Sequence, residues 1–294
     1  YTIYIEAFIH LSRGVEMKDL FSVKNKVALV TGGSRGIGEM ISAGFLANGS
    51  KVYISSRKAE VCDATAKRLS EEYQSECISL PSDLSNLEGI ESLVNQLKQK
   101  EGSLDILINN AGAAWGAPLE EYPENGWDKV MDTNVKGVFF LTQKLLPMLK
   151  EGAKKGPSRV VNIGSIDGLT RGSFENYAYG PSKAALHHLT RILAANLIRE
   201  KIIVNAIAPG PFPTWMLSTG VGFGGETDVD WTAVGNGNPS GRVGDINDIA
   251  GLAIFLCSRA SEYTVGQTIA CDGGAVVSLG GDNSPGGPTI DKVD

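Results

Sequence analysis

The chain is poor in the residues that bind metals or form disulfide frameworks. Its four cysteines, at positions 62, 77, 257 and 271, are far apart and include no C-x-x-C pair, and its three histidines do not group with them. This spacing indicates neither a disulfide-stabilised secreted domain nor a metal site. We therefore expect reduced cysteines, no bound metal and a cytoplasmic location.

An excess of positive charge and long apolar runs are also missing. The 294 residues contain 27 Lys and Arg against 33 Asp and Glu, a formal net charge of −6. Nucleic-acid-binding proteins usually present a basic face instead. No apolar run approaches the ~20 residues that cross a bilayer. We expect neither a nucleic-acid nor a membrane partner, and the hydrophobic content of 42% is sufficient for a large core.

Glycine, in contrast, is abundant and clustered. The stretch Gly32–Gly38 follows the apolar run Val27–Val30 and precedes a helical segment, Glu39–Asn48. Glycines between a strand and a helix let a pyrophosphate approach the backbone and place its charge at the helix N-terminus. The context predicts a nucleotide-binding loop, although a glycine-rich turn by itself is often only a turn.

One acidic residue is absent where dinucleotide-binding folds usually have it. About twenty residues past the glycine loop, an acid would bind the ribose 2′-hydroxyl, but this chain has Ser56-Arg57-Lys58 there. Arg57 and Arg35 of the glycine loop could instead hold a 2′-phosphate by charge-assisted hydrogen bonds. The alternative is a pair of solvated arginines. The sequence favours NADP(H) over NAD(H).

Apolar runs alternate with helical segments along the chain. Strands are expected at 27–30, 52–56, 77–80, 104–108, 159–165, 202–208 and 267–271, and helices at 39–48, 59–73, 86–100, 126–149, 176–199 and 246–258. About seven βα units predict an α/β fold, a single-domain, Rossmann-type, doubly wound parallel sheet with helices on both faces.

The two ends of the chain are expected to lie outside this domain. Residues 17–280 are predicted to form it, preceded by an extension of unknown role at 1–16 and followed by a flexible tail at 281–294. The extension is apolar and aromatic and lacks an A-x-A-like cleavage pattern, which disfavours a signal peptide.

Polar or small residues follow several of the predicted strands. Thr31, Asn110, Ser165 and Pro209 each stand at a strand end, and ligands in doubly wound sheets bind beyond the carboxyl ends of the strands. Tyr179 begins the helix after the Ser165 strand, so it reaches the same edge. We expect one site assembled from these five places.

Two other polar residues leave their roles open. Asp83 follows the third predicted strand and could accept hydrogen bonds from an adenine amino group, cap the next helix, or do both. Asn134 lies inside the predicted helix 126–149, where asparagine is mildly unfavourable. It has either a specific function or a position facing solvent.

Tyr179 and Lys183 stand four residues apart near the start of a long predicted helix, so their side chains leave the same face. A fixed ammonium beside a phenol favours the phenolate, which lowers a pKa of about 10 and suits proton transfer near neutral pH. An isolated Tyr-x-x-x-Lys is more often an ordinary helix face. Among the eight tyrosines, only Tyr179 has a lysine at this spacing.

Together these motifs resemble the short-chain dehydrogenase/reductase family over roughly residues 20–280. Thr31-Gly-Gly-Ser-Arg-Gly-Ile-Gly38 matches the family's TGxxxGxG, Asn109-Asn-Ala-Gly112 its NNAG, and Tyr179-xxx-Lys183 its catalytic pair. The family's catalytic serine, the fourth member of its tetrad and its nicotinamide-holding segment are matched by Ser165, Asn134 and Pro209-Gly210 with Thr214. Each match is weak alone, but their order along the chain is very specific.

The resemblance implies reversible hydride transfer between a nicotinamide coenzyme and a carbonyl group. Tyr179 would donate the proton, Ser165 would hydrogen-bond the carbonyl oxygen, and Lys183 would lower the Tyr179 pKa and bind the nicotinamide ribose. Asn134 would hold a water between Lys183 and solvent. The residues expected to bind coenzyme are Gly32, Ser34, Arg35, Gly36, Ile37, Gly38, Ser56, Arg57, Asp83, Leu84, Asn110, Ala111, Gly112, Tyr179, Lys183, Pro209, Gly210, Phe212 and Thr214.

Within the family, the chain is most similar to NADPH-dependent 3-oxoacyl-acyl-carrier-protein reductases of the rhamnolipid-synthesis type. The similarity lies in Gly116–Pro123, Tyr177–His187 and Ile207–Gly210. It implies a small carbonyl or acyl substrate and a homotetramer or dimer. The chain departs from the pattern after Gly210, where Pro211-Phe212-Pro213 is stiff and 220–244 is glycine-rich, so the substrate itself is not carried over.

The aromatic residues of 212–240 predict either a lid over an apolar substrate or a hydrophobic subunit contact. Trp115, Phe174 and Trp215 are expected to line the substrate cleft. Two alternatives remain for the function. One is an NAD-dependent alcohol, sugar-acid or steroid dehydrogenase on the same fold. The other is a non-catalytic nucleotide-binding scaffold, which the complete set of four catalytic residues disfavours.

Overall fold

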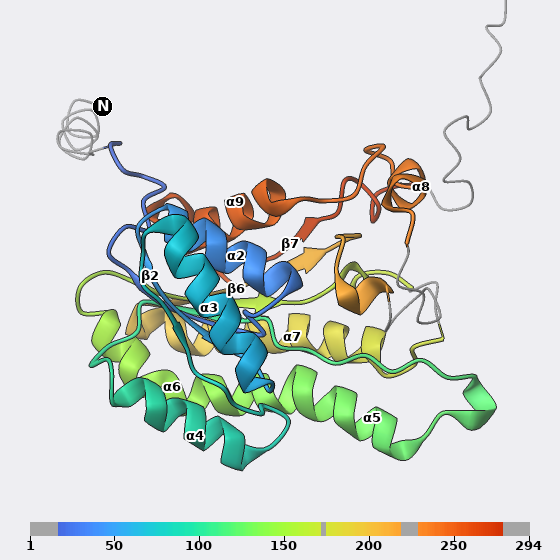
Figure 1. Ribbon diagram of the computed structural model, residues 1–294, viewed down its shortest axis with the longest axis horizontal. Coiled ribbons are helices and arrows are strands. Elements are labelled where there is room, and N and C mark those ends of the chain that lie inside the picture. Colours follow the sequence, from blue (N-terminus) through green and yellow to red (C-terminus); the bar gives the residue numbers. More distant parts are fainter. Residues whose placement is uncertain (1–16, 172–174, 219–228, 279–294) are drawn as a thin grey trace, which may run out of the picture.

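Seven strands form one parallel sheet in the part of the chain that the computed structural model describes, residues 17–171, 175–218 and 229–278 (Figure 1). The strand order is β3-β2-β1-β4-β5-β6-β7, and every neighbouring pair is parallel. The order reverses between β1 and β4, which is where doubly wound sheets bind their ligands. The strands are β1 Val27–Thr31, β2 Lys51–Ser55, β3 Cys77–Ser79, β4 Ile106–Asn109, β5 Ser158–Ile163, β6 Ile202–Pro209 and β7 Thr268–Cys271.

Helices cover both faces of this sheet. In Figure 1, α2, α3 and α9 lie on one side, and α4, α5, α6 and α7 lie on the other. The helices are α2 Gly36–Ala47, α3 Ala59–Tyr73, α4 Leu87–Lys98, α5 Glu124–Met131, α6 Gly137–Gly152, α7 Tyr179–Leu197, α8 Trp231–Asn236 and α9 Ile246–Cys257. Short turns of other helical types are η1 Leu119–Glu121, η2 Asp132–Lys136, η3 Ile166–Gly168, η4 Ile198–Glu200 and η6 Arg259–Ser261.

Two hydrophobic cores explain why the strands are almost continuously apolar. Val30 and Ile54 belong to the core under α2, α3 and α9, while Leu29 and Tyr53 belong to the core under α4, α6 and α7. Successive side chains of a strand point to opposite faces, so a sheet covered on both sides buries every position. The predicted α/β fold with seven parallel strands is confirmed.

The observed helices differ most from the predicted ones in three places. Helix α2 begins at Gly36, inside the glycine loop, rather than at Glu39. The predicted helix 126–149 is interrupted by η2, a π-turn between α5 and α6. The glycine-rich stretch after residue 220 contains the short helix α8, which starts because the Asp230 carboxylate accepts hydrogen bonds from the first turn.

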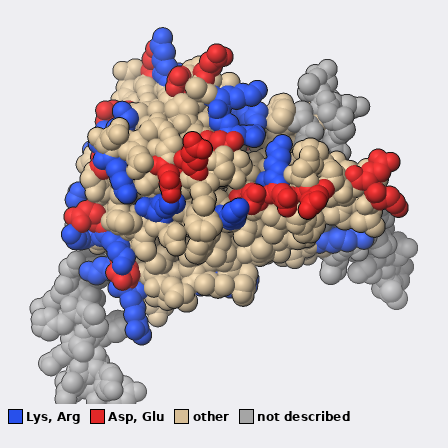
Figure 2. All heavy atoms as spheres, turned by 90° about the horizontal axis from the view of Figure 1, so that it is seen from below, with Lys and Arg blue, Asp and Glu red and all other residues tan. Residues whose placement is uncertain are grey.

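The face made by α4, α5 and α6 carries charges of both signs. Figure 2 shows Lys and Arg side chains interspersed with Asp and Glu there. One ion pair joins α6 to α4, with Lys144 Nζ 2.6 Å from Glu91 Oε1. Another lies within η2, with Lys136 Nζ 3.1 Å from Asp132 Oδ1.

Three sequence predictions fall wholly outside the described residues: the extension 1–16, the tail 281–294 and the cleft residue Phe174. The predicted lid, 212–240, is described only at 212–218 and 229–240. Among the described helices, none combines the length and the apolar character needed to cross a membrane.

Candidate active site

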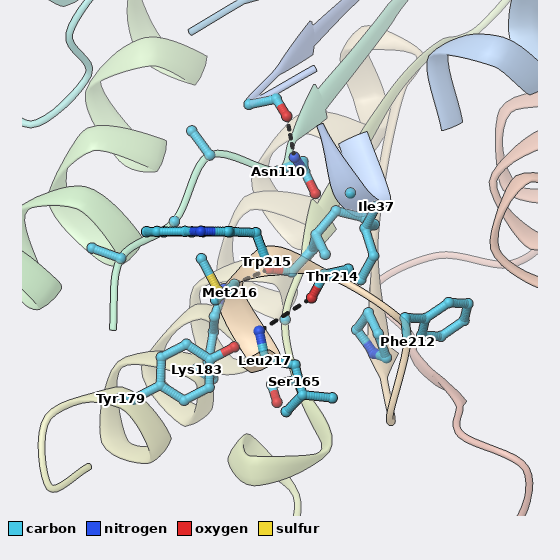
Figure 3. Close-up of a pocket in the computed structure, with 18 of the residues that line it drawn as sticks. Ile37, Asn110, Ser165, Tyr179, Lys183, Phe212, Thr214, Trp215, Met216 and Leu217 are labelled. Carbon is cyan, nitrogen blue, oxygen red and sulfur yellow. Dashed lines mark hydrogen bonds between the residues drawn. The ribbon is translucent and has the colours of Figure 1, made fainter. Parts of the chain in front are cut away.

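A cavity of about 1200 Å³ lies at the carboxyl ends of the strands. Figure 3 shows residues of several segments around it, with Asn110 and Ile37 on one side, Tyr179, Lys183 and Ser165 on the other, and Thr214, Trp215 and Met216 between them. All of the predicted coenzyme-binding residues except Gly38 line this cavity. The segments that were expected to meet at the carboxyl ends of the strands do surround one cavity, and Ser165 is among the residues that line it.

The glycine loop between β1 and α2 has the shape of a phosphate cradle. Gly32 and Gly36 have φ angles of +63° and +57°, which L side chains rarely adopt. A Cβ on Gly38 would collide with the carbonyl oxygen of Gly32, so Gly38 acts through close packing rather than from the cavity wall. Among the described residues, no side chain caps the N-terminus of α2, so its first-turn N–H groups are available to an anion.

Asn110 and Thr31 hold this loop against the neighbouring strand. Asn110 Nδ2 donates to the carbonyl oxygens of Thr31 and Gly32 at 2.9 and 3.1 Å. The Thr31 hydroxyl accepts from the N–H groups of Asn110 and Ala111, both at 3.0 Å. These bonds cross the point where the strand order reverses, and they give Asn110 a structural role in addition to its place on the cavity wall.

Arg35 and Arg57 supply positive charge to one part of the cavity. Both are exposed and both line it. Partial burial, together with the charge of Arg57, lowers the pKa of Arg35. Among the described residues, neither guanidinium lies within 4.0 Å of a carboxylate oxygen. Two like charges without an acidic partner favour binding of an anion between them.

Tyr179 is the first residue of α7 and is 9% exposed. Burial raises the pKa of its phenol to about 12, hydrogen bonding by Ser165 opposes the rise, and the charge of Asp167 adds to it. The predicted lowering of the pKa by Lys183 is therefore wrong for the protein alone. Removing the phenolate from water outweighs the attraction of an ammonium that lies 5.5 Å from the ring centroid.

Lys183 lies one turn further along α7 and is 4% exposed. Its Nζ donates to the carbonyl oxygen of Ile163 at 2.9 Å, which fixes the ammonium at the end of β5. Burial lowers the pKa of Lys183 to about 8. The side chain can therefore gain and lose a proton near neutral pH.

Ser165 follows β5 and begins η3. Its side chain is buried, and Oγ accepts from the N–H of Asp167 at 3.2 Å. A hydroxyl that accepts from the backbone keeps its own hydrogen free to donate. This suits a group that is expected to bind a carbonyl oxygen.

Asn134 lies in the π-turn η2, a distortion that is frequent at functional sites. Its Nδ2 donates to the Ala113 carbonyl and to the Ser182 hydroxyl, both at 2.9 Å, and its Oδ1 accepts from Ala113 N–H at 2.8 Å. It is 1% exposed, so the solvent-facing alternative is wrong. Asn134 does not line the cavity but joins the segment after β4 to the first turn of α7. Its expected role in holding a water stays a prediction.

Asp83 lines the cavity but does not cap α4. The cap is Asn86, whose side chain accepts from Gly89 N–H at 2.9 Å. Asp83 Oδ1 accepts from Ser85 N–H at 3.0 Å, because the chain makes a tight turn between β3 and the helix. The capping alternative is wrong, and binding of adenine stays a prediction.

The predicted substrate residues are not brought together. Trp115 packs beside α5, where Lys129 Nζ lies 5.1 Å from its ring centroid and Gly126 touches the ring, and it is not part of the cavity wall. Trp215 lines the cavity, but its ring lies 4.3 Å from Cζ of Arg35, on the glycine loop. Trp215 is therefore close to the part of the site expected to bind phosphate.

The cavity wall also contains residues that sequence reasoning missed. Some come from η3 and the loop after it, and others from the turn after β7: Asp167, Thr170, Arg171, Ala275, Val276 and Ser278. The residues after β7 could have been predicted from the sequence, because ligands bind beyond the carboxyl end of this strand as they do for the other strands. The residues of η3 and the loop after it could not, since no motif distinguishes them.

Within the described residues, no group of three or more His, Cys, Asp and Glu side chains could hold a metal ion. His187 is buried behind the Ser165 segment, where a Cβ on Gly164 or Gly168 would strike its ring. Burial lowers the pKa of His187 to about 4, so the imidazole is neutral. His188 is exposed.

A glycine loop after β1 and a buried tyrosine–lysine pair at the same sheet edge define a nucleotide-dependent oxidoreductase. The sequence model described as enoyl-(acyl carrier protein) reductase matches residues 32–276. The chain belongs to the short-chain dehydrogenase/reductase family, and its resemblance to that family is confirmed.

Two relatives of this chain have names that describe different activities. The chain is 46% identical over 259 residues to the rhamnolipids biosynthesis 3-oxoacyl-[acyl-carrier-protein] reductase of Pseudomonas aeruginosa, covering 88% of this chain and 99% of that protein. It is 36% identical over 262 residues to gluconate 5-dehydrogenase of Gluconobacter oxydans, covering 89% of this chain and 98% of the relative.

Solved structures agree with the fold. The Pseudomonas aeruginosa RhlG/NADP active-site complex has a TM-score of 0.81 at 46% identity, covering 88% of this chain and 100% of that chain. A gluconate 5-dehydrogenase from Burkholderia cenocepacia in complex with NADP and tartrate has a TM-score of 0.79 at 28% identity, covering 89% and 99%.

Proposed function

We propose that this protein is an NADP(H)-dependent oxidoreductase that reduces the carbonyl of a ketone or 3-oxoacyl group to a secondary alcohol. One observation carries the proposal. One cavity joins Arg35 and Arg57, an arginine pair with no acidic partner among the described residues, to a buried proton-transfer group formed by Tyr179, Lys183 and Ser165. The names of the relatives, a 3-oxoacyl reductase and an NADP complex among them, support it.

The cavity walls fit NADP(H). The loop 32–38 and the uncapped N-terminus of α2 would hold the pyrophosphate, and Arg35 with Arg57 would hold the 2′-phosphate. Asn110–Gly112 and Lys183 would contact the ribose on the nicotinamide side, and 209–214 would hold the nicotinamide itself. When bound, the coenzyme supplies the hydride that the carbonyl carbon accepts.

The chain's own residues handle the proton. With a pKa of about 12, Tyr179 keeps its proton at Oη at neutral pH, so it can donate to the alkoxide that develops on the carbonyl oxygen. Ser165 Oγ donates a hydrogen bond to the same oxygen and stabilises its charge. Lys183, with a pKa of about 8, is the group from which the resulting phenolate can recover a proton.

The test is turnover of NADPH with a panel of aliphatic ketones, sugar ketones and 3-oxoacyl thioesters. We expect Tyr179→Phe to reduce turnover about 10²–10⁴-fold and to leave NADPH affinity nearly unchanged. Arg57→Asp should instead raise the KM for NADPH and lower that for NADH. Wild-type-like turnover in Tyr179→Phe would exclude the proposed acid, and a Tyr179→Phe variant that no longer binds NADPH would show a structural defect instead.

We also propose that the protein works as a homotetramer or dimer in the cytoplasm, without nucleic acid. Large apolar side chains on the outer faces of α6 and α7 support self-association, since Phe139 is 36% exposed and Ile192 is 48% exposed. Light scattering on the purified protein gives its mass in solution, and a monomer would contradict the proposal.

A further inference from the structure

The indole of Trp215 covers a residue of the predicted phosphate site. Its ring centroid lies 4.3 Å from Cζ of Arg35, which is the distance of a cation–π contact. Trp215 is still 57% exposed, so the indole covers the guanidinium from outside the fold rather than from the core. Both residues line the cavity.

The adjacent residue makes a second contact with the same loop. A Cβ placed on Gly36 would lie 3.2 Å from Cγ2 of Thr214, so Thr214 rests directly on the glycine loop. The Thr214 hydroxyl accepts from Leu217 N–H at 3.3 Å, and its carbonyl accepts from Ser218 N–H at 3.1 Å. Figure 3 shows the first of these bonds beside the cavity. These bonds give the backbone of the segment that carries Trp215 a defined turn.

Arg35 needs such support. Partial burial and the charge of Arg57 both disfavour its guanidinium, as the lowered pKa of Arg35 indicates. No carboxylate of the described residues offsets this repulsion. The negative face of an indole does offset it, and stacking also fixes the guanidinium plane. The N–H groups at the edge of a stacked guanidinium stay available for a phosphate.

We propose that Trp215 is a positioning residue for the coenzyme 2′-phosphate: its ring holds the Arg35 guanidinium in place, so that the preference for NADP(H) over NAD(H) depends on a residue of the substrate-side segment. This role differs from the cleft-lining role that the sequence suggested for Trp215. It rests on the proposed function, because it requires a coenzyme that carries a 2′-phosphate.

The test compares Trp215→Phe, which keeps an aromatic face, with Trp215→Leu, which keeps apolar bulk without one. Affinities for adenosine 2′,5′-bisphosphate and for 5′-AMP are measured by calorimetry on the full chain, so the readout needs no hydride transfer. Tyr263→Leu removes a fully exposed ring outside the cavity and serves as the matched control.

We expect Trp215→Leu to weaken binding of the bisphosphate about three- to tenfold, the range of a partly exposed cation–π contact. Binding of 5′-AMP should not change, and Trp215→Phe and the control should behave like wild type. In an Arg35→Ala background, Trp215→Leu should have no further effect. The ratio of kcat/KM for NADPH and NADH should fall by the same factor.

Four results would overturn the inference. Equal bisphosphate binding by Trp215→Leu would mean that the ring does not help Arg35, and tighter binding would mean that the ring blocks it. An equal loss of affinity for both nucleotides would mean a structural defect. If the wild-type protein itself does not prefer the bisphosphate to 5′-AMP, the NADP(H) assignment fails together with the inference. Failure of the inference alone leaves that wild-type preference intact.

Discussion

The low pKa of Lys183 predicts a measurable dependence of stability on pH. Burial lowers this pKa from 10.5 in the unfolded chain to about 8 in the folded protein. Below pH 8 the lysine is charged in both states, and folding carries the full penalty of burying the ammonium. Between pH 8 and 10.5 the unfolded chain binds the extra proton, so the free energy of unfolding rises with pH.

The magnitude follows from the shift. Each pH unit within that window is worth about 1.4 kcal/mol. The free energy of unfolding of wild type, minus that of Lys183→Met, should therefore rise by about 2 kcal/mol from pH 8 to pH 10, because the slope is smaller close to each of the two pKa values. Tyr179 acts in the opposite direction only above pH 10, because its pKa is raised to about 12 in the folded protein. Stopping at pH 10 keeps the two effects apart.

The assay is urea denaturation of wild type and Lys183→Met at pH 7, 8, 9 and 10, followed by fluorescence. Groups other than Lys183 titrate in both proteins and cancel in the difference. At pH 7 we expect the methionine variant to be the more stable of the two. A difference that stays constant from pH 7 to pH 10 would refute a depressed lysine pKa, and with it the idea that Lys183 returns the proton to Tyr179.

Two further predictions concern Gly38, which packs behind the glycine loop, and Asp167, which lines the cavity. Gly38→Ala should destabilise the protein by about 1–3 kcal/mol, because the new methyl group collides with the Gly32 carbonyl, and it should weaken NADPH binding. Calorimetric unfolding measures the loss of stability, and titration with NADPH measures the loss of affinity. An unchanged Tm would contradict the close packing. Asp167→Asn removes a charge that raises the Tyr179 pKa, so the alkaline limb of the reduction rate should move to lower pH; a limb that stays in place or moves upward would show that Asp167 does not act on the phenol.

Local patterns in the sequence account for much of the fold. Helix α3 spans 59–73 as predicted, because its residues are helix formers between two chain turns. The strands were recognisable because a sheet covered on both faces needs unbroken apolar runs. The glycine loop was recognisable from its position between β1 and α2. Because ligands bind beyond the carboxyl ends of parallel strands, it was then possible to predict, without knowledge of side-chain positions, that Thr31, Asn110, Ser165 and Pro209 lie at one edge of the sheet.

The sequence by itself determined which residues face one another along one element, as the four-residue spacing of Tyr179 and Lys183 does. Only the tertiary structure decided how those residues behave. The direction in which the Tyr179 pKa shifts depends on burial by distant segments. The hydrogen bonds of Asn134 depend on a π-turn that meets α7. The contact of Trp215 with Arg35 joins residues 180 positions apart. Desolvation and long-range contacts have no local pattern, because they arise only when the chain has folded.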